Sequence, residues 1–208
     1  IEIKDVCDYH IYPIADNDTP KLSSDRLEYS LSNALFTYEL CDINQIRKMY
    51  NDITIQKDED GIDELGFKTE QIALDFVKIT SKLSIIYRED RTRYSMQLIA
   101  DILKKLSIEK KVTKEDLYTL KESEIINIIS ESKYKDIFNK WRKATKVNSS
   151  KDRPENVYYV HHGAKIRYID PLINGKRISK ASSKADKMIK ENLSYDMNNY
   201  VSLNFELK

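Results

Sequence analysis

The stretch Ser24-Asp-Arg-Leu-Glu-Tyr-Ser-Leu-Ser-Asn33 decides the predicted fold. Read as a helix at 100° per residue, it places Asp25, Tyr29 and Asn33 in one row, with Arg26 three residues before Tyr29. A carboxylate can bind a divalent metal, and an arginine beside a tyrosine hydroxyl can bind a phosphate. The pattern therefore indicates either a site for a metal and a phosphate or an ordinary surface helix.

The same stretch is also a good helix start. Ser23 or Ser24 can serve as the N-cap, and acidic residues occupy the first turn. The predicted helix covers residues 23–40. Its apolar side chains recur at helical spacing: Leu27, Leu31, Ala34, Leu35 and Tyr38. Taken alone, the spacing favours this structural interpretation.

Composition extends the helical prediction to most of the chain. Only four glycines and four prolines occur in 208 residues, so turns and strands are expected to be scarce. The clearest apolar face steps by 4, 3, 4 and 3 residues: Ile72, Phe76, Ile79, Leu83 and Ile86. Other helices are predicted over residues 1–13, 42–52, 91–111, 113–120, 123–130 and 134–146. These helices with short connectors predict an all-α core.

The remaining segments are less helical. Residues 53–66 read as a short strand with an acidic turn or as a surface loop, and the spacing does not match a calcium-binding EF-hand. The polar cluster at 148–154 reads as a linker. A hairpin (157–160 with 166–169), a helix (179–193) and a strand (200–205) are predicted after it. The predicted fold class is mainly α, with a small C-terminal α+β tail.

The segment Ile14-Ala-Asp-Asn-Asp-Thr-Pro-Lys-Leu-Ser-Ser-Asp-Arg-Leu-Glu-Tyr29 resembles the last metal-ligand motif of the HD-domain phosphohydrolases. In that superfamily a His, a His-Asp dipeptide and a distant Asp bind a divalent metal. The resemblance implies that Asp25 is a metal ligand and that Arg26 and Tyr29 contact substrate phosphates. Asn33 falls where dNTP hydrolases tend to have an Asp that touches the sugar, so a sugar contact is possible while deoxynucleotide specificity stays open.

A second resemblance lies near the C-terminus. Residues 165–173 and 175–179 are similar to the tail that follows the helical core in a bacterial branch of the same superfamily. With this tail, the resemblance implies two parts. Residues 1–147 would be the C-terminal part of a helical HD-type core, and residues 148–208 would be a small α+β tail.

The histidines of the family motif are missing from this sequence. No His-Asp dipeptide occurs, and the three histidines are His10, His161 and His162. We therefore expect the chain to be the C-terminal portion of a longer protein whose His and His-Asp ligands lie upstream. Asp25 would then be one ligand of a divalent metal (Mn, Mg, Fe, Ni or Zn), whose identity depends on the full ligand set.

The charge distribution and the cysteines indicate which substrates and which cell compartment to expect. Residues 1–68 carry 15 acidic and 7 basic residues, whereas residues 69–208 carry 19 acidic and 28 basic residues. An acidic front and a basic rear are consistent with a metal–phosphate substrate, although solvated lysine-rich helices give the same pattern. Cys7 and Cys41 fit neither a zinc site nor a disulfide framework. With no membrane-length apolar run, we expect a cytoplasmic protein that does not enter a membrane.

The leading functional hypothesis is part of a metal-dependent phosphohydrolase that acts on a nucleotide or another phosphoester. The alternative is a catalytically silent helical module that binds a nucleotide, nucleic acid or a protein partner through its basic C-terminal half. Residues 133–153 interleave lysines and arginines with Tyr134, Phe138 and Trp141, a pattern that can bind a nucleic-acid backbone. An amphipathic helix with buried aromatic residues and solvated lysines explains the same pattern and is favoured.

Overall fold

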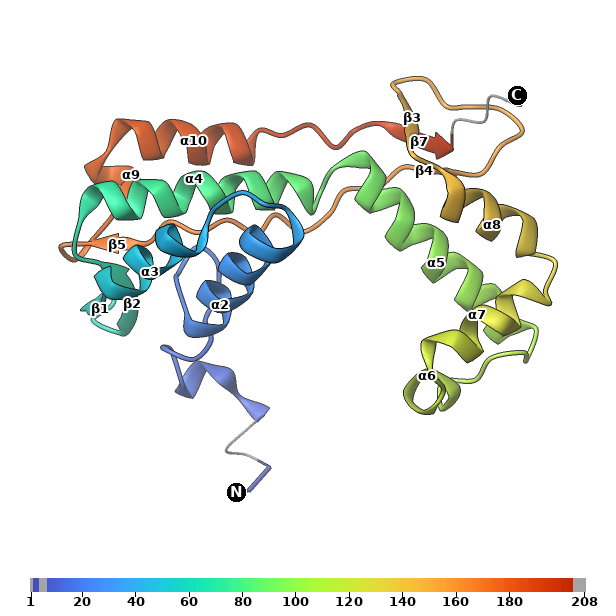
Figure 1. Cartoon of the computed structure of the whole chain (residues 1–208), viewed down its shortest axis with the longest axis horizontal. Helices are drawn as coiled ribbons and strands as arrows, with labels where there is room; N and C mark the ends of the chain where they lie inside the picture. The colour runs from blue at the N-terminus through green and yellow to red at the C-terminus, as the bar shows by residue number, and fades with distance from the viewer. Residues whose placement is uncertain (1, 4–6, 204–208) are drawn as a thin grey trace. The chain divides into compact units, whose positions relative to one another are not determined.

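The chain leaves its first structural unit after residue 86 and returns to it near residue 165 (Figure 1). A computed structural model describes residues 2–3 and 7–203. The first unit comprises Ile1–Ile86 with Lys165–Tyr195, and the second comprises Tyr87–Ala164 with Asp196–Lys208. The predicted division into residues 1–147 and 148–208 stays a prediction; its boundary falls inside the second unit.

The first unit combines helices with a four-stranded sheet. Its helical elements are η1 (Tyr9–Ile11), α2 (Ser24–Ser32), η2 (Asn33–Thr37), α3 (Ile43–Asp52), α4 (Glu70–Ile86), α9 (Ile178–Ala181) and α10 (Ser183–Leu193). Its strands are β1 (Ile53–Lys57), β2 (Asp63–Phe67), β5 (Leu172–Ile173) and β6 (Lys176–Arg177). The strand order is β1-β2-β5-β6, in which only the β2–β5 pair is parallel. Helices α4 and α10 run side by side (Figure 1).

The core of the first unit follows from the predicted apolar face of α4. Phe76, Ile79 and Leu83 are buried there, and the Phe76 ring lies 5.1 Å from that of Phe67 in β2. Fully burying such side chains contributes about 1.5–3 kcal/mol each. The predicted helix over 72–86 is therefore confirmed.

Gly66 makes the parallel β2–β5 pairing possible. It pairs with Leu172, and a Cβ atom at this position would lie 2.6 Å from the Leu172 carbonyl oxygen. That distance is too short for any side chain, so the close approach requires glycine. This pairing joins the returning segment to the first hairpin across more than 100 residues.

The second unit packs helices against a three-stranded antiparallel sheet. Its helices are α5 (Asp90–Ile108), α6 (Asp116–Thr119), α7 (Glu122–Ser130) and α8 (Lys135–Lys143). Its strands are β3 (Val147–Ser150), β4 (Tyr159–Val160) and β7 (Tyr200–Leu203), in the order β3-β7-β4. The buried cluster draws on helices and strands alike: Tyr94, Leu98, Ile102, Leu106, Val112, Ile129, Phe138, Val160 and Val201.

The predicted fold class was wrong. Two sheets accompany the helices, so the described chain has an α/β fold and is not mainly α. The predicted linker at 148–154 contains most of β3, and β4 pairs with β7 instead of forming a hairpin with residues 166–169. Strands of two to four residues with distant partners leave too little alternation for a local pattern to detect.

Other local predictions were confirmed. Residues 53–66 were predicted as a short strand with an acidic turn or as a surface loop; the strand and the turn are present, and a second strand, β2, completes a hairpin with β1. Helices occupy the predicted segments 42–52, 91–111 and 179–193, with a break at Ser182 in the last. The predicted strand over 200–205 is β7 as far as Leu203. Part of the predicted helix over 1–13 and residues 204–205 lie outside the described residues.

Candidate functional site

Helix α2 begins as its sequence predicts. The Ser23 hydroxyl accepts a hydrogen bond from the Arg26 backbone N–H at 3.3 Å, which is N-cap geometry. Leu27 and Leu31 are buried on the inner face of the helix. Asp25 lies in the first turn, where its backbone N–H donates to the Ala15 carbonyl oxygen at 3.1 Å. Its side chain is exposed and has no hydrogen bond or ion pair among the described residues. Its carboxylate therefore faces solvent at the positive end of the helix dipole.

The Arg26 guanidinium holds the loop that leads into α2. It donates to Thr19 Oγ1 at 3.1 Å, to the Lys21 carbonyl oxygen at 3.1 Å and to the Asn17 carbonyl oxygen. Three of its N–H donors are thus used within residues 17–21. The structure gives this side chain a role in fixing the loop, and its predicted contact with a substrate phosphate stays a prediction.

Tyr29 and Asn33 follow Asp25 along α2. The Tyr29 side chain is half-buried, and its hydroxyl has no hydrogen-bond partner in the described part of the chain. Asn33 opens the π-helical turn η2, where its amide oxygen accepts a hydrogen bond from Thr37 Oγ1 at 3.4 Å. The helix brings Asp25 and Tyr29 one turn apart, as the spacing predicts. The phosphate and sugar contacts stay predictions.

A cluster of exposed polar side chains joins η1 to the loop before α2. His10 Nδ1 lies 2.7 Å from Asp8 Oδ1, and His10 Nε2 lies 3.3 Å from Asp18 Oδ2. The Tyr9 hydroxyl donates to Asp18 Oδ1 at 3.1 Å. Hydrogen bonds to Asp8 and then Asp18 raise the pKa of His10, and the same imidazole holds the pKa of each carboxyl below its usual range.

The acidic turn after β1 is a structural element. Asp58 Oδ1 accepts hydrogen bonds from the backbone N–H groups of Asp60 (2.9 Å) and Ile62 (2.8 Å). Its other oxygen lies 2.5 Å from Lys21 Nζ. The Asp58 carboxylate therefore stabilises its own turn and pairs with Lys21.

The described residues do not by themselves fit a complete metal site. No group of three or more His, Cys, Asp or Glu side chains capable of holding a metal occurs among residues 2–3 and 7–203. Asp25 fits the role of a single ligand because its carboxylate is exposed and uncommitted. We therefore derive no catalytic step through a metal.

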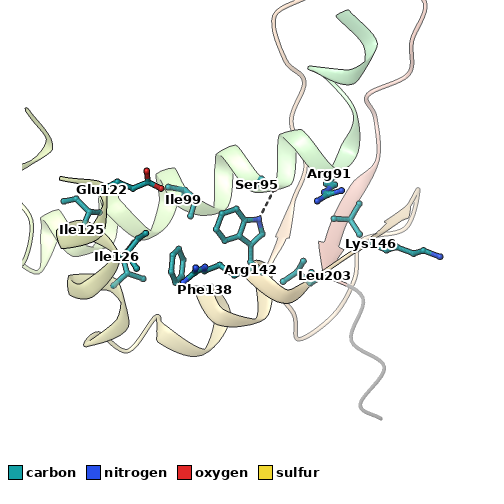
Figure 2. Close-up of a pocket in the computed structure, with 14 residues that line it drawn as sticks. Arg91, Ser95, Ile99, Glu122, Ile125, Ile126, Phe138, Arg142, Lys146 and Leu203 are labelled. Atoms are coloured by element: carbon teal, nitrogen blue, oxygen red, sulfur yellow. Dashed lines mark hydrogen bonds between the residues drawn. The ribbon is translucent and has the colours of Figure 1, made fainter. Parts of the chain in front are cut away.

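The second unit contains a pocket that sequence reasoning missed (Figure 2). Its volume is about 420 Å³, within the range of small-molecule sites. The walls come from α5, α7, α8, the segment between α8 and β3, the start of β3 and the end of β7. They are lined by Arg91, Ser95, Ile99, Glu122, Ile125, Ile126, Ile129, Phe138, Trp141, Arg142, Ala144, Lys146, Val147 and Leu203. The amphipathic pattern of α8 signalled the aromatic wall, but local spacing could not indicate the hollow between elements.

The basic and aromatic stretch at 133–153 matches the amphipathic interpretation. Phe138 is buried, and the Trp141 indole N–H donates to Ser95 Oγ at 2.9 Å. Several of its lysines are engaged on the surface: Lys133 lies 2.9 Å from Glu109 Oε1, and Lys151 donates to an aspartate of the same unit. The aromatic rings are thus used in packing and are not presented as a row for stacking bases.

Comparisons with protein-family models, with curated proteins and with solved structures find no match to this chain. Within the described residues, none of the helices has the length and apolar character needed to cross a membrane.

Proposed function

We propose that the first unit supplies Asp25 as one ligand of a divalent metal in a phosphohydrolase that acts on a nucleotide or another phosphoester. The observation that carries this proposal is the uncommitted Asp25 carboxylate on the first turn of α2. By contrast, Asp18 and Asp58 of the same unit are each paired with a basic side chain, His10 and Lys21. An exposed carboxylate held by a capped helix is a suitable metal ligand.

The residues around Asp25 support the proposal by positioning it. Ser23 caps the helix, and Arg26 fixes the loop before it, so the backbone that carries Asp25 is held from both sides. The Tyr29 hydroxyl, one turn further along and without a partner in the described chain, is available to donate to a phosphate oxygen. When bound, a metal would polarise the phosphoryl group and lower the pKa of a bound water.

The proposal implies a cytoplasmic protein whose remaining metal ligands come from outside the described residues. The two cysteines support this compartment, because Cys7 and Cys41 are free thiols in the described structure. Unpaired cysteines are typical of reducing compartments.

The test compares Asp25→Ala with Glu28→Ala in the natural full-length protein. Glu28 is a second exposed acid on α2, so its removal changes the helix charge equally. We expect Asp25→Ala to lose bound metal, measured by elemental analysis, and to lose Mn²⁺- or Mg²⁺-dependent hydrolysis of nucleotides and p-nitrophenyl phosphate. Glu28→Ala should retain both. Unchanged metal content and turnover in Asp25→Ala would contradict the proposal.

A further inference from the structure

The pocket of the second unit carries more positive than negative charge. Arg91, Arg142 and Lys146 line it, against the single acid Glu122. Figure 2 shows Arg91 and Lys146 toward the Leu203 end of the pocket, with the Lys146 side chain extending outward, whereas Glu122 lies at the other end beside Ile125. In the described part of the chain, none of the three cations has a carboxylate within salt-bridge distance.

Arg91 is the most informative of these cations. It is the second residue of α5, where the helix dipole disfavours a positive charge. The neighbouring carboxylate of Asp90 does not neutralise it, because Asp90 pairs with Arg93 and accepts a hydrogen bond from Asn199 Nδ2 at 3.1 Å. An anion bound in the adjoining hollow would offset this unfavourable interaction of Arg91 with the helix dipole.

The body of the pocket is apolar and offers few hydrogen bonds. Between the charged ends its walls are branched aliphatic side chains and the rings of Phe138 and Trp141. The indole N–H is already bonded to Ser95, and the Arg142 guanidinium lies 5.8 Å from the centre of the Phe138 ring. A nucleobase would leave its polar edge unpaired against such walls, whereas an alkyl chain would not.

We propose that this pocket binds a small amphipathic anion, with an unbranched alkyl body along the aliphatic walls and a carboxylate or phosphate head at the end lined by Arg91 and Lys146. The apolar body supplies affinity through burial, and the cations fix the orientation. This site lies in the second unit and does not depend on Asp25.

Trp141 provides an intrinsic fluorescence signal for ligand binding. Trp141 is the only tryptophan and lines the pocket, so its fluorescence can follow binding to the full chain. Hexanoate, octanoate and decanoate are titrated below their micelle-forming concentrations. We expect each added methylene to tighten binding about fourfold until the cavity is filled. Decyl phosphate in place of decanoate then distinguishes a phosphate from a carboxylate head.

Matched variants separate the charge from the apolar body. Arg91→Gln/Lys146→Gln should weaken decanoate binding about tenfold and leave uncharged decanol unchanged. Lys104→Gln/Lys114→Gln removes two exposed charges that do not line the pocket and should alter neither ligand. Ala144→Leu, which fills part of the cavity, should weaken both ligands while circular dichroism confirms that the variant is folded.

Several results would overturn the assignment. One is equal affinity for decanoate and decanol in the unmodified chain, and another is tighter binding of AMP or of a single-stranded oligonucleotide. Self-association that shields Trp141 and is not displaced by decanoate would show that a second copy occupies the pocket. Asp25→Ala should keep decanoate binding, so failure of the proposed hydrolase and failure of this site are distinguishable.

Discussion

Removing the buried Arg177 side chain should destabilise the first unit more than any surface substitution. Arg177 is 5% exposed, and all five of its N–H donors are used. They bond to Glu64 at 2.7 and 2.8 Å, to Glu59 at 2.9 and 2.8 Å and to the Asp170 carbonyl oxygen at 3.0 Å. Glu64 is fully buried and also accepts from the Leu22 backbone N–H at 2.9 Å. One guanidinium thus joins the first hairpin to the returning segment.

The magnitude follows from burial. Losing one partner of a buried ion pair costs about 3–5 kcal/mol because the other charge stays buried without compensation. The Glu59 side chain is 45% exposed, so its bond contributes only about 0–1 kcal/mol. We therefore expect Arg177→Met to lower the free energy of unfolding by about 4 kcal/mol. With a urea m-value of about 2 kcal/mol/M, the midpoint falls by about 2 M.

Urea unfolding followed by far-UV circular dichroism measures this change, and Trp141 fluorescence reports on the second unit separately. Arg177→Met/Glu64→Gln removes the buried charge as well, and we expect it to recover about 1–2 kcal/mol of the loss. Glu59→Gln is the control, with a change of at most about 1 kcal/mol. The reasoning is refuted if Arg177→Met costs less than about 1 kcal/mol, or if the double variant is no more stable than Arg177→Met.

Two further predictions concern the first unit. Gly66→Ala should destabilise the unit by about 1–3 kcal/mol in the same urea assay, because the added Cβ would lie 2.6 Å from the Leu172 carbonyl oxygen. An unchanged urea midpoint would show that β2 and β5 can separate at little cost. His10 should titrate above its ordinary pKa in an NMR experiment, and Asp8→Asn or Asp18→Asn should lower that pKa. Because the pKa of His10 is raised in the folded state, any stabilisation by this cluster is present below the ordinary histidine pKa and is lost as pH rises through the raised value. A His10 pKa that does not change in either variant would contradict the contacts with Asp8 and Asp18.

The sequence correctly predicted the features that depend only on residues close together in the chain. The Ser23 cap, the buried Leu27 and Leu31 and the apolar face of α4 need only neighbouring residues, and each was confirmed. The β2–β5 and β3–β7 pairings join segments that are far apart in sequence. Their strands are short, and their registers depend on single features such as the close approach at Gly66. Periodicity within a window carries no information about such partners.

The candidate sites also differ in whether neighbouring residues or distant segments form them. Asp25 and Tyr29 come together on one face of α2 because helical spacing alone places them there. The pocket of the second unit needs α5, α7, α8 and two strands at once, so no motif marks it. Besides the amphipathic pattern of α8, the sequence signals it through Arg91, a cation in the first turn of a long helix, where the helix dipole disfavours a positive charge.

Arg26 shows why a side chain's type and spacing do not fix its role. The sequence places the Arg26 guanidinium directly after the Asp25 carboxylate and three residues before the Tyr29 phenol, which suits a phosphate. The folded loop offers the same guanidinium three fixed oxygens from Thr19, Lys21 and Asn17. These oxygens compete with a phosphate for the Arg26 guanidinium. A free phosphate loses translational freedom when it binds, whereas oxygens already fixed in the loop do not. In the structure, Arg26 therefore fixes the loop that leads into α2, and its predicted contact with a substrate phosphate stays a prediction.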